Sequence, residues 1–266
     1  MKSACIKEKN IIMANVVPVR KDQHQNLKVT TKRGLEHIEK QHIAPITAAE
    51  YTKAANSFPI FLVKQPEGSS FRSIVMLGLE AGENLYYKDE RWTGTYLPHG
   101  ASMVPFGLGI DPDKEKTLTT YIDLDSAYVG DDKDNALFDA EGLVTDFYKN
   151  VQESLGRLYE NETMTERFMV ELAENDLLRE LELHINFSTG ENKKLVGLFG
   201  INEKKLQELS EAKVLDFHKR GLFIPIHAML GSIGQINRLA QLRNLSDSEQ
   251  KVTAIQIQFA KETAEA

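Results

Sequence analysis

Residues 59–79 read PIFLVKQPEGSSFRSIVMLGL, two apolar runs joined by a turn-forming segment. The runs, residues 59–63 and 71–79, contain many β-branched and aromatic side chains, and residues 65–70 contain proline, glycine and serine. Apolar runs of this length on either side of a Pro/Gly segment are typical of a β-hairpin with a buried face. The stretch therefore predicts antiparallel β-structure in the first half of the chain.

The sequence before and after this hairpin supports the same class of fold. Thr47-Ala-Ala-Glu50 fits a capping box and predicts a short helix through residue 55, because its two side chains can satisfy free amides at a helix start. Shorter strand signals occur at residues 14–19, 24–31, 85–87 and 117–122. The N-terminal half is thus predicted to be mostly antiparallel β-structure.

The second half changes to helical spacing. Phe147, Val151 and Leu155 lie on one face of a predicted helix that starts near residue 145. Residues 161–163 are predicted to interrupt it, and a second helix over 164–181 would complete a helical hairpin. A second β-hairpin (183–187 and 194–199) follows, then helices over 202–209, 211–220 and from Pro225 onward, with Gly221 as a helix stop. Strands followed by helices in this order predict an α+β fold.

Composition limits the class of protein. The chain has 266 residues, a net charge of −7 and one cysteine, Cys5, so it can form no intramolecular disulfide. No apolar run approaches the roughly 20 residues of a membrane span, and the N-terminus lacks the apolar core of a signal peptide. A cytoplasmic protein without a membrane span is therefore expected.

Charge is unevenly distributed along the chain. Residues 1–53 carry a net +5, whereas residues 111–146 carry eleven acids against three lysines. A weak basic segment followed by an acidic one disfavours binding to a phosphate backbone, so no nucleic-acid partner is expected.

No catalytic or metal-binding motif is complete in this sequence. The phosphate-loop, dinucleotide-binding and nucleophile-elbow patterns are each incomplete. His37 and His42 are five residues apart, one more than a shared helical face needs, and the acidic stretch around Asp111 and Asp123 lacks the glycine and glutamate of a calcium loop. We therefore expect a solvated acidic loop, no bound metal, no cofactor and no catalytic residue.

One segment has an unusual composition. Residues 91–107 contain the only tryptophan and several glycines and prolines, a combination typical of an irregular loop. Arg91, Trp92, Tyr96, His99 and Phe106 are the candidate ligand- or partner-binding residues. The alternative is that Trp92, Tyr96 and Phe106 fill the core, since large aromatic side chains usually do so.

A second candidate surface consists of small residues on the last strong helix. Ala228, Gly231 and Ser232 would let another backbone approach closely. The neighbouring backbone could belong to the same chain, which is the commoner case, or to a second subunit of an oligomer.

Motifs in a fixed order along the chain resemble the bacterial SapC family. They are Met13-Ala-Asn-Val-Val-Pro18, His42-x-x-Pro-Ile-Thr-Ala-Ala-Glu50, Phe58-Pro-Ile60, Leu77-Gly-Leu-Glu-x-Gly-Glu-Asn-Leu85, Arg91-Trp92, Tyr96-Leu-Pro98, Pro105-Phe106, Ala136-Leu-Phe-Asp139, Asp176-Leu-Leu178, His227-Ala-x-Leu-x-Ser-Ile233 and Arg238-Leu239. The resemblance covers residues 13–243. It implies one α+β domain over that range, either undivided or in two lobes (13–143 and 144–243). Residues 1–12 would then be an extension ahead of an alternative start at Met13, and residues 244–266 a tail whose alternation at 255–259 fits an edge strand.

The resemblance also suggests a role. The family is associated with bacterial surface layers, and its members are often encoded beside halogenase-like proteins and outer-membrane receptors, which implies an accessory role in uptake or modification. Together with the incomplete motifs, this favours a non-enzymatic accessory or binding protein with a protein partner. The alternatives are an enzyme or small-ligand-binding protein with its site in the loop from Arg91 to Phe106, in which His99 would be the acid/base group, and a structural surface-layer protein.

Overall fold

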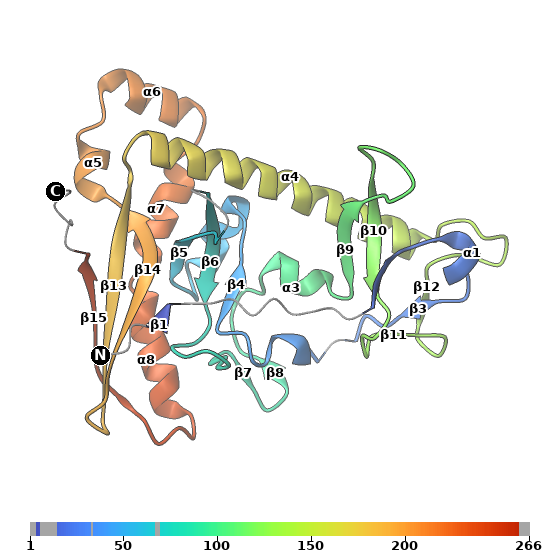
Figure 1. Cartoon of the computed structure of the whole chain (residues 1–266), viewed down its shortest axis with the longest axis horizontal. Coiled ribbons are helices and arrows are strands. Elements are labelled where there is room, and N and C mark those ends of the chain that lie inside the picture. The colour runs from blue at the N-terminus through green and yellow to red at the C-terminus, as the bar shows by residue number, and fades with distance from the viewer. Residues whose placement is uncertain (1–3, 6–14, 33, 67–69, 261–266) are drawn as a thin grey trace. The chain divides into compact units, whose positions relative to one another are not determined.

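The computed structural model describes residues 4–5, 15–32, 34–66 and 70–260 and has the predicted α+β fold (Figure 1). Its largest sheet has the strand order β15-β13-β14-β5-β6-β4, with β1 (Ala4–Cys5) parallel to β14 outside this order. All the pairs within the order are antiparallel. The sheet joins strands from widely separated parts of the sequence.

The hairpin predicted from residues 59–79 is confirmed. β5 (Ile60–Lys64) pairs with β6 (Phe71–Met76), with Ile60 opposite Val75 and Lys64 opposite Phe71. The outer strand β4 (Ile43–Pro45) pairs with β6. Most side chains of β5 and β6 are buried, which explains why these runs are apolar on both faces.

The second predicted hairpin is also confirmed, and it is longer than expected. β13 (Leu178–Phe187) and β14 (Asn192–Ile201) form it, and β15 (Val252–Phe259) pairs with β13 at one edge of the sheet. β15 lies within residues 244–266, predicted as a C-terminal tail whose alternation at 255–259 fits an edge strand. Residues 178–181, predicted as the end of a helix, are instead the start of β13.

The predicted helical hairpin is wrong. A single helix, α4, runs from Asp146 to Glu174 without a break at residues 161–163. Asn161 and Thr163 are only modestly unfavourable inside a helix, at about 0.5 kcal/mol each. The buried side chains Leu155, Phe168 and Leu172 on either side favour continuation of the helix more strongly.

α4 is terminated by Asp176, an aspartate in the left-handed position that glycine usually occupies. Asp176 adopts a left-handed conformation (φ 55°), its amide donates to the carbonyl of Ala173, and the amide of Leu177 donates to that of Leu172. This is the Schellman pattern, in which the left-handed position is usually glycine. Gly221 (φ 70°) ends α6 in the same way, as predicted.

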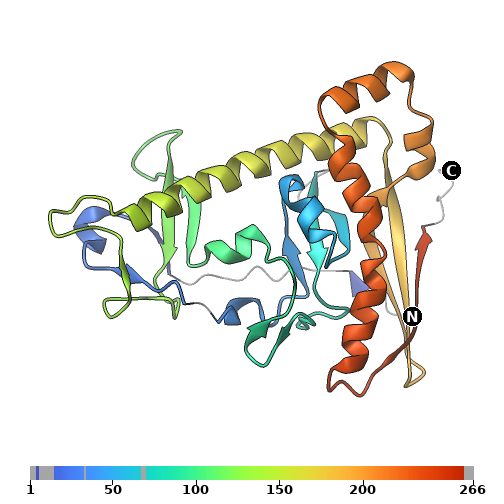
Figure 2. The same ribbon diagram turned by 180° about the vertical axis from the view of Figure 1, so that it is seen from behind.

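Four helices follow β14, and two of them, α7 and α8, pack against strands of the large sheet. The four are α5 (Glu203–Gln207), α6 (Glu211–Lys219), α7 (Phe223–Ser232) and α8 (Gln235–Leu245). Figure 2 shows α7 and α8 following each other along the sheet. The short helices η1 (Glu36–Ile38), η2 (Ala48–Glu50) and α2 (Tyr51–Ala54) and the hairpin β7 (Tyr87–Lys88) and β8 (Arg91–Trp92) complete this part of the chain.

The chain divides into two compact units that interleave along the sequence. Unit 1 comprises residues 1–8, 36–98 and 162–266, and unit 2 comprises residues 9–35 and 99–161. Neither unit is a continuous stretch such as 13–143 or 144–243. α4 contributes its first half to unit 2 and its second half to unit 1.

Unit 2 contains two small sheets. Their strand orders are β2-β10-β9 and β11-β3-β12. The elements are β2 (Val16–Pro18), α1 (Lys21–His24), β3 (Lys28–Val29), α3 (His99–Met103), β9 (Phe106–Ile110), β10 (Leu118–Asp123), β11 (Val129–Gly130) and β12 (Asn135–Ala136).

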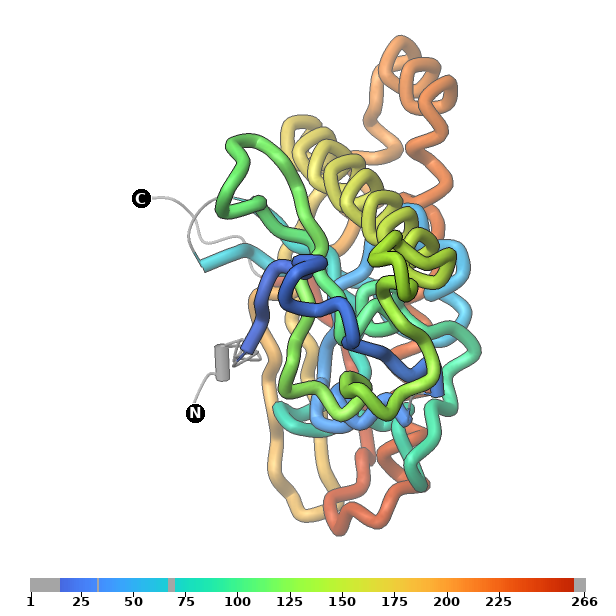
Figure 3. Tube along the Cα trace, turned by 90° about the vertical axis from the view of Figure 1, so that its right-hand side faces the viewer, coloured from blue at the N-terminus to red at the C-terminus, as the bar shows by residue number. Residues whose placement is uncertain are grey.

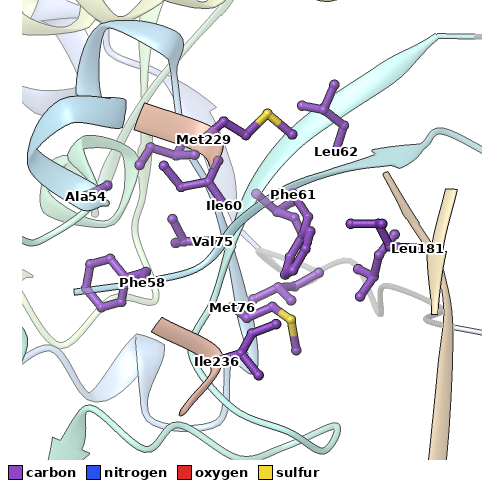
Figure 4. Packing of buried hydrophobic residues seen from close by; sticks show 14 of the residues in the cluster. Ala54, Phe58, Ile60, Phe61, Leu62, Val75, Met76, Leu181, Met229 and Ile236 are labelled. Atoms are coloured by element: carbon purple, nitrogen blue, oxygen red, sulfur yellow. The ribbon is translucent and has the colours of Figure 1, made fainter. Parts of the chain in front are cut away.

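Each unit has its own hydrophobic core. In unit 1, side chains of β5 and β6 meet those of α2, α7, α8 and β13, and Figure 4 shows Ile60, Phe61, Val75, Met229 and Ile236 among them. In unit 2, Phe106, Ile122 and Leu155 belong to a second cluster.

Ser232, one of the three small residues on α7, lies fully buried in the core of unit 1. Its hydroxyl accepts a hydrogen bond from the amide of Ile60 at 2.9 Å and donates one to the carbonyl of Met229 at 2.6 Å. Ala228 packs against the same core, whereas Gly231 is exposed. The small side chain of Ser232 thus allows α7 to cross β5 closely within one chain.

Candidate functional site

Residues 91–107 are called the aromatic loop below. Its tryptophan, Trp92, packs on the core of unit 1. Its ring centroid lies 5.8 Å from that of Phe58 and 5.9 Å from that of Tyr86. The indole Nε1 donates to the carbonyl of Tyr96 at 2.9 Å. A side chain at Gly94 would approach the indole to 2.9 Å, so the loop needs glycine there to close over Trp92.

Tyr96 binds a buried carboxylate. Its hydroxyl donates to Oε1 of Glu50 at 2.7 Å, and Glu50 is only 6% exposed. Oε2 of Glu50 accepts from the amide and the hydroxyl of Thr47, at 2.9 and 2.7 Å. The predicted capping box therefore forms and also anchors the aromatic loop. Burial, together with the charge of Glu50, raises the pKa of Tyr96, so its phenol is a proton donor in this pair.

The residues between Trp92 and Tyr96 are fastened to the same region. The amide of Thr93 donates to the carbonyl of Tyr86 at 2.8 Å. The hydroxyls of Thr95 and Ser57 share a hydrogen bond, and the amide of Thr95 donates to the hydroxyl of Ser57 at 3.3 Å. The loop is thus held at several points along its length.

Arg91 lies at the exposed end of a tight hairpin. Asp89 and Glu90, the two residues between β7 and β8, have φ angles of 50° and 58°. Two successive positive φ angles define a type I′ turn, which normally contains asparagine and glycine. The tip of this hairpin, residues 88–91, is charged and exposed.

His99 and Phe106, the other two predicted site residues, belong to unit 2. His99 begins α3, where its carbonyl accepts from the hydroxyl of Ser102 at 2.7 Å. Phe106 is buried and stacks on Tyr148 with ring centroids 6.3 Å apart. The structure therefore brings Trp92 and Tyr96 together in unit 1 and places His99 and Phe106 separately in unit 2.

A charged cluster in unit 1 was not predicted. The guanidinium of Arg243, buried in α8, binds Glu80 at 3.0 Å and also pairs with Glu83. Lys193 on β14 binds the other oxygen of Glu80 at 3.1 Å. Although partial burial opposes the effect, hydrogen bonds from Arg243 and Lys193 lower the pKa of Glu80.

Only two of the four charged residues of this cluster stand near each other in the sequence. Glu80 and Glu83 stand in the motif of residues 77–85 on which the SapC resemblance partly rests, but Arg243 and Lys193 are distant in sequence. Gly78 belongs to the same motif, and a side chain there would collide with the carbonyl oxygen of Glu83. This motif therefore fixes the loop after β6 to α8 and β14.

Unit 2 contains a comparable buried ion pair within the acidic stretch. Nη1 of Arg20 donates to Asp111 at 3.1 Å, and Nη2 lies 2.7 Å from a carboxylate oxygen of Asp113. The hydrogen bond from Arg20 lowers the pKa of Asp111 to about 2. The prediction of a solvated loop is wrong for Asp111, whose side chain is almost fully buried.

Among the residues that the structure describes, no group of three or more His, Cys, Asp or Glu side chains could hold a metal ion.

Helix α6 turns apolar side chains outward. Leu215 and Val214 are 53% and 41% exposed, and they share a helix face with Glu211 and His218, which are also exposed. The α5–α6 segment is the orange coil in Figure 3. An amphipathic helix of a folded protein normally turns such residues toward the core, whereas on α6 these two lie at the surface and only Phe217 is buried.

Two partly exposed cations attach α6 to α4. Lys213 and Arg220 bind the carboxylate of Glu171 on α4, at 3.3 and 2.9 Å. Both cations also lie 5.7 Å from the ring centroid of Phe217, which is fully buried. The hydrogen bond from Arg220, opposed by partial burial and reinforced by Lys213, lowers the pKa of Glu171. Ion pairs and one aromatic ring therefore attach α6 to the molecule, and its aliphatic residues are left at the surface.

These features define an α+β protein with a predominantly antiparallel sheet and two exposed aliphatic side chains on helix α6. The chain belongs to the SapC family, because the model of that family matches residues 19–239. No curated protein and no solved structure matches the chain. None of the helices in the described ranges is long and apolar enough to cross a membrane.

Proposed function

We propose that this chain is a non-enzymatic accessory protein that acts in the cytoplasm by binding a protein partner through the outer face of α6. The observation that carries the proposal is the exposure of Val214 and Leu215 on α6, a helix that ion pairs from Lys213 and Arg220 attach to Glu171 of α4. Apolar side chains exposed next to each other on one face of a helix are typical of surfaces that a partner covers.

The energetics of α6 favour a partner over a purely structural explanation. Complete burial of a valine or leucine side chain contributes about 1.5–3 kcal/mol. The structure leaves much of this contribution unused at two adjacent positions of α6, while Phe217 alone among its large apolar residues is buried. A partner that covers Val214 and Leu215 would gain this contribution without rearranging α6.

The contacts of the aromatic loop also support the proposal, because they argue against a ligand site there. Trp92 and Tyr96 make hydrogen bonds within unit 1, and their rings pack against its core. This fits a packing role for the loop better than a ligand-binding one.

The test compares affinity captures from the native cell. The variant Val214→Glu/Leu215→Glu should keep the fold, because both positions are exposed and glutamate favours helices. The matched control is Met164→Glu, a change at another exposed apolar residue, on α4.

We expect the wild-type chain and the control to retain a common partner that the double variant loses, with the same thermal unfolding for all three. Retention of that partner by the double variant would overturn the proposed surface. A turnover that His99→Ala abolishes without unfolding the chain would overturn the non-enzymatic role.

A further inference from the structure

We propose that the partner of α6 is a second copy of this chain, whose α6 packs against it in antiparallel orientation about a two-fold axis at Leu215. This inference rests on the proposed function, because it names the protein that would cover Val214 and Leu215. It begins from the order of the side chains along the outer side of α6.

Three exposed residues form one line along the outside of α6. Glu211, Leu215 and Lys219 are four residues apart, a spacing that places side chains next to each other along a helix. Leu215 lies about 200° around the helix from the buried Phe217, so the line is on the side that faces away from the core. An acid, an apolar side chain and a base therefore follow one another on the surface that a partner would cover.

The charges at the two ends of this line are not used within the chain. Lys213, Asp216 and Arg220, the other charged residues between positions 211 and 220, all form ion pairs within unit 1. Among the residues that the structure describes, Glu211 and Lys219 form no ion pair. A partner can therefore pair with both charges without breaking a contact that holds α6 in place.

The order of these residues makes the line complementary to itself. A two-fold axis at Leu215 reverses the line in the second copy, so Glu211 of each copy lies beside Lys219 of the other, and the two Leu215 side chains meet at the centre. Rows of residues four apart are also the ridges that pack most often between helices of globular proteins. A parallel arrangement would place like charges beside each other at both ends, which favours the antiparallel one.

Helix stability alone explains only part of this pattern. An acid in the first turn and a base in the last turn favour any helix, which accounts for the signs of Glu211 and Lys219. It does not account for an apolar Leu215, 53% exposed, between them. Because α6 is only nine residues long, two such helices bury a small area, and the association should be weak and dependent on concentration.

The test is a charge exchange at the two ends of the line. Glu211→Lys and Lys219→Glu each bring like charges together twice in a homodimer, whereas a 1:1 mixture of the two variants brings opposite charges together twice. Both positions are exposed, so each variant should keep the fold. The matched control is Lys149→Glu, at an exposed lysine of α4.

Sedimentation over a range of concentrations should show association for the wild-type chain and for the control. Each α6 variant should raise the dimer dissociation constant about fivefold or more, and the mixture should restore association. α6 variants that associate as well as wild type, or a mixture that associates no better than either variant, would overturn the inference.

A wild-type chain that stays monomeric at all concentrations would also overturn it. If capture from the native cell then still yields another protein that Val214→Glu/Leu215→Glu loses, the second copy is the wrong partner and the proposed function stands. If that capture yields no such protein, the proposed function fails as well.

Discussion

Tyr96 and Glu50 show how side chains with catalytic potential can be used for packing. A phenol and a carboxylate 2.7 Å apart could form a proton-transfer pair, yet Glu50 is buried and also accepts two hydrogen bonds from Thr47. The pair connects the capping box at the start of η2 to the aromatic loop. Its chemistry therefore serves the stability of unit 1.

Tyr96→Phe tests this role. Removing the hydroxyl leaves one oxygen of Glu50 without this donor, which should lower the free energy of unfolding by about 1–2 kcal/mol. Urea-induced unfolding measures the change, and capture of the cellular partner should be unaffected. Unchanged stability together with lost partner binding would instead make Tyr96 part of a binding site.

The ionisation of Asp111 should make the stability of unit 2 depend on pH. Its folded-state pKa is about 2, below the ordinary value of 3.8, so its contribution to stability is present above about pH 4 and is lost as the pH falls toward 2. Asp111→Asn should lower the unfolding temperature at pH 5, and the difference from wild type should shrink as the pH falls through about 2. A difference that stays constant over this range would contradict the assigned ion pair with Arg20.

At the scale of whole elements, α8 is attached to the sheet by charges as well as by its apolar side. Arg243 connects α8 to Glu80 and Glu83 in the loop after β6, and Glu80 in turn binds Lys193 on β14. A buried guanidinium is stable only when its charge is compensated, so each carboxylate matters beyond its own hydrogen bond.

Arg243→Met is expected to destabilise unit 1 by about 2–3 kcal/mol, less than for a fully buried pair because Glu80 is partly exposed. The change can be measured by chemical unfolding. Glu208→Gln removes a carboxylate that pairs with Lys205 at the surface and is the control, since surface ion pairs contribute about 1 kcal/mol or less. Equal effects of the two variants would contradict the role given to Arg243.

Element boundaries were predictable where the signal is local. The capping box at Thr47 and the stop at Gly221 each depend on residues within one helical turn, and both are confirmed. The end of α4 was missed because Asp176 takes a conformation that the sequence suggests only for glycine or asparagine. The outward face of α6 was missed as well, because the ion pairs that attach this helix involve Glu171, a residue of another helix.

At the scale of the whole molecule, contacts between distant residues limited the prediction. The α+β class and both hairpins followed from periodicity, but the order β14-β5 joins segments that share no local signal. The candidate site showed the same limit: composition identified Trp92 and Tyr96, whereas their hydrogen bonds and the Arg243 cluster emerge only after folding. β15 also lies beyond the residues that match the SapC family and still forms an edge of the sheet.

The central claim, that the outer face of α6 binds a protein partner, is tested most directly by cross-linking in the native cell. A photoreactive side chain placed at Leu215 should capture one discrete partner, and the same group at Met164 on α4 should not, although both positions are similarly exposed. A discrete adduct from position 164 with none from position 215, or none from either position, would contradict the account.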